Sequence, residues 1–187
     1  NIDKKITDLF LKKKYDEVIK ISKKYTTPYE RSPSLANLIG ISILYSKNFT
    51  ENDAKSALDC FVETYENDKI GEHGLNGIYH LITVSIQLFK EYKSVQVYTS
   101  LSKKYYLEAE KNFEGNDKFL TAGYLLFKHL LDHKKLKKII DQILNGNSQS
   151  KILRSWCLMF GNYLSDWSQK NHYDQTILNS KYFPKLI

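Results

Sequence analysis

The chain has 187 residues, of which 42% are hydrophobic and 26% charged, a balance typical of globular proteins and not of disordered ones. Its three prolines and eight glycines are too few for a protein built from strands and tight turns. Of its 28 basic residues only Arg31 and Arg154 are arginines, and segment 51–72 carries seven acids against two lysines. Because nucleic-acid recognition favours the arginine fork and a sustained basic face, we expect no nucleic-acid partner despite the net charge of +7.

Apolar residues recur at helical spacing along most of the chain, and polar or proline-containing stretches interrupt them. This pattern predicts helices over residues 2–10, 15–25, 34–47, 51–68, 75–89, 91–111, 118–133, 134–144 and 150–167. Most of the expected connections are short, which is typical of helical hairpins. No apolar run reaches about 18 residues, so we expect no membrane span.

The second helices of the expected hairpins share a sequence pattern. Each opens with an apolar or small residue, followed three positions later by a small or β-branched one: Val18, Ala57, Val95 and Ile139. These four residues are separated by steps of 39, 38 and 44 residues. A nearly constant step between helix pairs predicts a solenoid, in which each pair buries its apolar face against the next. An irregular all-helical domain with chance spacing is the alternative.

Two stretches carry a resemblance to a known family. "KYDEVIK" at Lys14–Lys20 resembles the start of the second helix of a tetratricopeptide repeat, and "NLIGISILY" at Asn37–Tyr45 resembles a first helix. Gly40 stands at the family's close-packing glycine. The resemblance implies an all-α fold, a right-handed α-α superhelix (TPR-like solenoid) of about four helical hairpins over residues 1–145. Residues 146–187 would form a C-terminal helical cap or junction.

The resemblance also implies which residues contact a partner. First helices line the concave groove of tetratricopeptide arrays, so the family's groove-facing positions carry over to this chain by alignment. The candidates are Asn37, Ile41, His80, Val84, Gln87, Tyr124 and Lys128. The family's carboxylate clamp needs several lysines and asparagines in the groove, and Asn37 alone does not make one.

Other motifs do not predict chemistry. His129 and His133 have the spacing of zinc ligands on a helix, but the pattern lacks the glutamate of zinc proteases and further ligands. "GEHGLNG" at Gly71–Gly77 lacks the ending of a phosphate loop and is interpreted as a hairpin loop. Cys60 and Cys157 are expected in the core. We therefore expect no catalytic residues, no metal site and no cofactor.

The C-terminal segment holds both tryptophans, Trp156 and Trp167, which would cover the end of a repeat array. Its second interpretation rests on "NYLSDW" and "KYFPKLI", which resemble the segment that joins repeats to the catalytic domain in bacterial O-linked N-acetylglucosamine transferase-like proteins. In that case the chain would be the N-terminal repeat fragment of a modular glycosyltransferase and would bind acceptors.

These observations predict a protein–protein interaction scaffold that binds a peptide or helix in a concave groove and performs no catalysis of its own. We expect a protein or peptide partner, no membrane, and a monomer or weak homodimer. Two distant cysteines without metal or redox spacing favour a reducing, cytoplasmic location.

Overall fold

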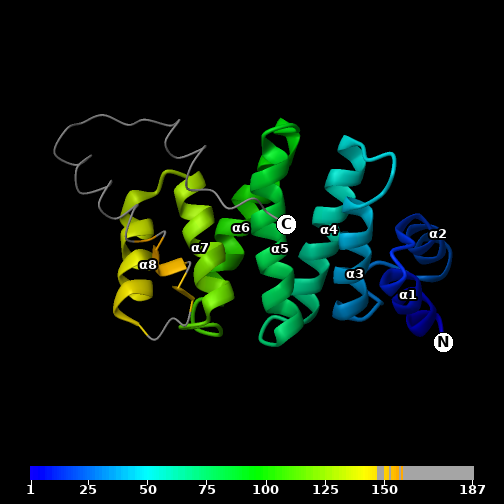
Figure 1. Cartoon of the computed structure of the whole chain (residues 1–187), viewed down its shortest axis with the longest axis horizontal. Coiled ribbons are helices and arrows are strands. Elements are labelled where there is room, and N and C mark those ends of the chain that lie inside the picture. The colour runs from blue at the N-terminus through cyan, green and yellow to red at the C-terminus, as the bar shows by residue number, and fades with distance from the viewer. Residues whose placement is uncertain (147–149, 152, 156, 158–187) are drawn as a thin grey trace. The chain divides into compact units, whose positions relative to one another are not determined.

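A computed structural model describes residues 1–146, 150, 151, 153–155 and 157, and divides the chain into two compact units (Figure 1). Unit 1 comprises Asn1–Asn112, and unit 2 begins at Phe113. Over the described ranges every regular element is a helix, which confirms the all-α prediction. The predicted boundary between residues 145 and 146 stays a prediction, because most of the C-terminal segment lies outside the described residues.

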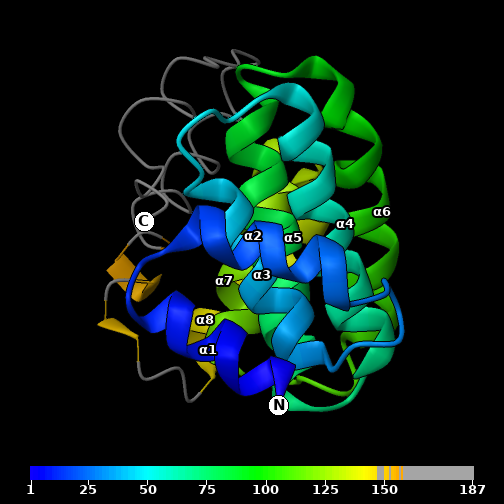
Figure 2. The ribbon, with the colours of Figure 1, turned by 90° about the vertical axis from the view of Figure 1, so that its right-hand side faces the viewer.

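Unit 1 is a succession of antiparallel helices. Its elements are α1 (Ile2–Leu11), α2 (Tyr15–Tyr25), α3 (Pro33–Leu44), α4 (Glu51–Asn67), α5 (Glu72–Phe89), the short 3₁₀ helix η1 (Lys93–Val95) and α6 (Gln96–Ala109). Each α-helix packs against the next, and α3 also contacts both α1 and α5. Seen from the end of the unit, α4 and α6 lie together on one side, with α3 and α5 beside them (Figure 2).

Unit 2 contains a helical hairpin, α7 (Asp117–His129) followed by α8 (His133–Asn145). Arg154 closes the end of α8, since its Nη1 and Nη2 donate to the carbonyl oxygens of Ile143 and Leu144 at 2.8 and 3.0 Å. Those carbonyls belong to the last turn, where a helix lacks its own donors. Through Arg154, the described part of the segment after α8 is therefore hydrogen-bonded to the hairpin.

Side-chain caps fix several helix starts. The hydroxyl of Thr50 accepts from the backbone N–H of Asp53, and the Asp53 carboxylate accepts from the backbone N–H of Thr50 at 2.9 Å. This reciprocal capping box satisfies two N–H groups that the first turn of α4 leaves unpaired. Ser32 caps α3 and Asn116 caps α7. The sequence placed the start of α4 at residue 51, as observed, and the starts of α3 and α7 one residue later than the structure has them.

The four positions that define the repeat step are all in the core. Val18, Ala57 and Val95 are completely buried, and Ile139 is 1% exposed. Val18 lies on α2, Ala57 on α4 and Ile139 on α8, whereas Val95 ends η1 directly before α6. The expectation that these residues pack inside second helices is confirmed for three of them, and the fourth falls one residue before its helix.

Two glycines mark close contacts between helices. A Cβ atom on Gly40 of α3 would lie 2.7 Å from Cε1 of Phe61 on α4, which supports the predicted role of Gly40 in close packing. A Cβ atom on Gly77 of α5 would lie 2.8 Å from the backbone nitrogen of Tyr65. The interpretation of Gly71–Gly77 as a hairpin loop is wrong, because α5 begins at Glu72 and its glycines allow α4 and α5 to approach.

Candidate functional site

Five of the predicted groove residues lie in unit 1, on neighbouring first helices. Asn37 and Ile41 belong to α3, and His80, Val84 and Gln87 belong to α5. Gln87 is exposed and the other four are partly exposed. We call these five residues the first-helix surface.

One hydrogen bond links the two halves of this surface. Nδ1 of His80 lies 2.8 Å from Oδ1 of Asn37, and donation to that oxygen requires the proton on Nδ1. The His80 ring also packs against the ring of Phe61, with centroids 5.2 Å apart. Two candidates that are 43 residues apart in sequence therefore meet side by side, as expected if α3 and α5 occupy equivalent places in successive hairpins.

The helices that carry the first-helix surface are almost without charge. The sequence of α3 contains no acidic or basic residue, and Glu72 is the one carboxylate or ammonium group of α5. By contrast, α2 carries acidic residues in its first turn and several lysines. A partner that docks on this surface would meet aliphatic, aromatic and amide groups.

The two remaining candidates lie on α7 in unit 2 and are buried. Tyr124 is completely buried and Lys128 is 2% exposed, with its ammonium 5.8 Å from the centre of the Tyr124 ring. Burial lowers the pKa of Lys128 to about 7 because desolvation disfavours the ammonium form. Neither side chain presents an open contact surface in this structure.

The histidines with zinc-ligand spacing do not share a helix. α7 ends at His129 and α8 begins at His133, and the chain turns between them at Leu131, whose φ is +57°. In the described part of the chain, no group of three or more His, Cys, Asp or Glu side chains could hold a metal ion.

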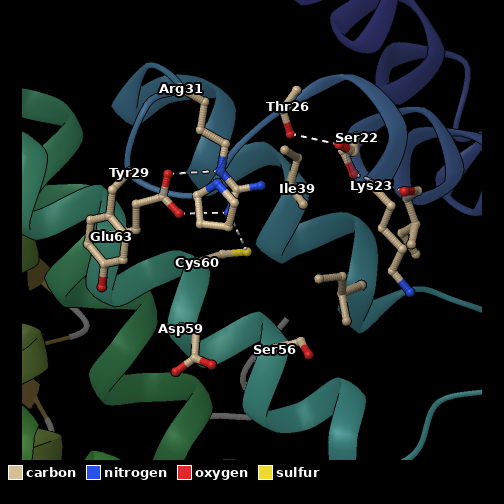
Figure 3. A pocket seen from close by; sticks show the side chains of 13 residues that line it. Ser22, Lys23, Thr26, Tyr29, Arg31, Ile39, Ser56, Asp59, Cys60 and Glu63 are labelled. Carbon is tan, nitrogen blue, oxygen red and sulfur yellow. Dashed lines mark hydrogen bonds and ion pairs between the residues drawn. The ribbon is translucent and has the colours of Figure 1, made fainter.

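A second feature of unit 1 is a pocket of about 580 Å³ between α2, the α2–α3 loop, α3 and α4 (Figure 3). Its apolar wall consists of Ile19, Ile39 and Ile43, and polar side chains contributed by α2, the loop and α4 surround that wall. A volume of several hundred Å³ with an apolar base and a few polar groups is typical of small-molecule sites.

A buried ion pair forms one side of this pocket. Arg31 Nε donates to Oε1 of Glu63 at 2.8 Å and its Nη2 donates to Oε2 at 2.6 Å, so the contact is bidentate. The side chain of Arg31 is 10% exposed and that of Glu63 is 2% exposed. Nη2 also lies 3.6 Å from the sulfur of Cys60. Burial alone would lower the pKa of Arg31, but the hydrogen bonds and charge of Glu63 keep it above its usual value.

Cys60 contributes its thiol to the same part of the pocket and is 5% exposed. Burial raises its pKa to about 11, an effect that the nearby guanidinium opposes. The thiol is thus protonated at neutral pH, which disfavours a nucleophilic role. Cys60 and Cys157 are both buried free cysteines, as expected for core residues.

Two acidic residues of α4 have partners on α6. Asp59 accepts a hydrogen bond from the hydroxyl of Tyr98 at 2.7 Å, and Glu66 accepts one from Tyr105. Burial, followed by these hydrogen bonds, raises the pKa of both tyrosines. Two acids of the segment 51–72 therefore join α4 to α6.

The pocket was not predicted from the sequence. Its one available signal was Arg31, an arginine in a chain whose basic residues are almost all lysines. Arginine is favoured for buried bidentate pairing with carboxylates, so its position in "TTPYERSP" could have marked the loop as anchored. Nothing in the sequence pointed to Glu63, 32 residues away, as the partner.

No protein-family model matches this chain, and neither a curated protein nor a solved structure gives a match. The segments that suggested a junction to a glycosyltransferase domain, together with Trp156 and Trp167, lie outside the described residues. Among the helices that the structure describes, none is both long enough and apolar enough to cross a membrane.

Proposed function

We propose that the protein is a tetratricopeptide-like interaction module that binds a peptide or helix on the first-helix surface. The observation that carries this proposal is the contact between Asn37 and His80, which joins residues 43 positions apart on consecutive first helices. Side-by-side first helices form a continuous surface on which a partner could lie.

The lack of charge on α3 and α5 supports a partner with an uncharged, apolar face. A charged ligand would bind weakly to aliphatic and amide side chains, because it would lose its hydration without forming a compensating ion pair. Binding should therefore depend weakly on salt concentration, in contrast to binding that relies on the lysines of α1 and α2. We place the module in the cytoplasm because both of its cysteines are buried free thiols.

A peptide-display library gives a test that needs no known partner. Peptides selected on the whole chain should be rich in apolar residues, and substitutions Val84→Glu and Gln87→Lys should each weaken their binding at least about ten-fold. Ser100→Lys on the exposed side of α6 is the matched control and should leave affinity unchanged. Thermal unfolding of each variant separates lost binding from lost folding.

Two results would contradict the proposal. The first is that selected peptides bind folded Val84→Glu protein as tightly as the unsubstituted chain, which would place their site elsewhere. The second is that the purified chain retains nucleic acid and selects no peptide, which would overturn the expectation that its partner is a protein.

A further inference from the structure

The pocket between α2 and α4 has one unpaired charge of each sign on its two walls. Lys23 on α2 makes no ion pair or hydrogen bond with any described residue. Asp59 on α4 makes no ion pair within the described chain, and the hydroxyl of Tyr98 occupies one of its oxygens. Figure 3 shows these two side chains on different sides of the pocket, with Ile39 above the space between them.

The other two charges of the pocket neutralise each other. Arg31 and Glu63 form the bidentate pair described above, so they add no net charge to the cavity. The two N–H groups on Nη1 of Arg31 have no partner among the described residues and remain available as donors. A buried guanidinium with unused N–H groups is a suitable donor for a carboxylate.

The space between these groups is apolar. Ile19, Ile39 and Ile43 line it, and the hydroxyls of Ser22 and Thr26 already donate to backbone carbonyl oxygens of α2. A ligand that fills the pocket therefore needs an apolar body, an anionic end for Lys23 and Arg31, and a cationic end for Asp59. The cavity of about 580 Å³ is within the range of sites for small organic molecules.

We infer that this pocket binds a short zwitterionic peptide with apolar side chains. Its C-terminal carboxylate accepts hydrogen bonds from Lys23 and from Nη1 of Arg31, its N-terminal ammonium pairs with Asp59, and its side chains contact the three isoleucines. The inference is independent of the proposed function, because none of the five residues of the first-helix surface lines the pocket.

The first experiment changes the ligand and leaves the protein intact. The dipeptide Leu-Leu is titrated into ¹⁵N-labelled full-length chain, and amide shifts are followed by NMR. We expect saturable shifts at residues of α2, the α2–α3 loop and α4. N-acetyl-Leu-Leu lacks the ammonium and Leu-Leu-amide lacks the carboxylate, so each should bind at least about ten-fold more weakly than Leu-Leu.

The second experiment removes each charge from the protein. Asp59→Asn should weaken Leu-Leu about ten-fold and leave N-acetyl-Leu-Leu unchanged, because that ligand has no ammonium to lose. Lys23→Gln should weaken Leu-Leu but not Leu-Leu-amide. The matched controls are Lys20→Gln, also exposed on α2 but outside the pocket, and Asp141→Asn on α8, and both should bind Leu-Leu like the unsubstituted chain.

Three results would overturn the inference. The first is an absence of saturable shifts with Leu-Leu up to its solubility limit. The second is equal binding of Leu-Leu and both capped forms, which would show an apolar cavity that does not recognise charge. The third is saturable shifts at α3 and α5 without shifts in the α2–α3 loop, which would locate the ligand on the first-helix surface.

Discussion

Arg31 lies in a loop, but its side chain is largely buried and pairs with a distant helix. It lies two residues after Tyr29, which adopts a left-handed backbone conformation with φ of +65°, and its side chain reaches from the α2–α3 loop to Glu63 on α4. Its ion pair with Glu63 removes two charges from water, and only the bidentate geometry compensates for the lost hydration. The pair is therefore better understood as fixing the position of the loop than as a large net source of stability.

Removing one partner of this pair should be far more damaging than removing both. We expect Arg31→Met to lower the free energy of unfolding by about 3 kcal/mol, because it leaves Glu63 charged and buried without a cation. The double substitution Arg31→Met with Glu63→Leu should recover most of that loss. Urea unfolding of the two single variants and the double variant measures the coupling as a thermodynamic cycle.

A double variant that is as unstable as the sum of the two single variants would show that the residues act independently. Lys14→Met provides the control, because its pairing with Glu17 is exposed and such pairs contribute about 0–1 kcal/mol.

At the scale of elements, periodicity was sufficient to predict the helices but not their ends. The break between α1 and α2 was expected at Lys12–Lys14, and the chain does turn there, with Lys13 at φ of +57°. No glycine marks this turn or the one at Leu131, so local sequence gives little sign of a left-handed residue. The start of α5 was placed too late because Gly74 was interpreted as a loop residue, whereas it lies inside the helix and a Cβ atom there would collide with the backbone oxygen of Asp68.

One contact of the candidate site joins two residues that the sequence had assigned to the same surface. Asn37 and His80 were assigned to one surface by carrying over the partner-facing positions of tetratricopeptide repeats, and in the structure a hydrogen bond links them. The pocket depends on a contact between a loop and a distant helix, for which no periodic signal exists. Tyr124 and Lys128 were predicted as partner-binding residues by the same alignment. An alignment does not indicate whether a side chain is exposed, and both of these are buried.

The two close-packing glycines should respond differently to alanine. A helical Gly→Ala change ordinarily gains about 1 kcal/mol from propensity. We expect Gly77→Ala instead to lower the free energy of unfolding by about 2 kcal/mol, because its Cβ would meet the backbone of α4. Gly40→Ala should lower the free energy of unfolding by less, because the nearest neighbour of its Cβ is the Phe61 ring, which can shift. Chemical denaturation measures both, with Ser100→Ala as the exposed reference, and a stabilised Gly77→Ala would refute the close approach of α4 and α5.

At the scale of the whole chain, the division after Asn112 separates six α-helices from the α7–α8 hairpin. Unit 1 has a core of its own, which includes the completely buried side chains of Ile6, Phe61 and Ile78. Its last helix is joined to α4 by the hydrogen bonds of Tyr98 and Tyr105. In stacked hairpins stability is approximately a sum of terms for each unit and its neighbours, so removing a terminal hairpin need not unfold the rest.

We therefore expect residues 1–112 to fold without the remainder of the chain. The fragment should give a helical circular dichroism spectrum and a single cooperative thermal transition, because α1–α6 retain the contacts that bury their apolar faces. A shorter fragment of residues 1–90 is the matched comparison. It lacks α6, which leaves the Tyr65 ring without its contact to Tyr105 at 4.8 Å between centroids, so it should unfold at a lower temperature. A 1–112 fragment that melts without cooperativity would show that unit 1 depends on the hairpin that follows it.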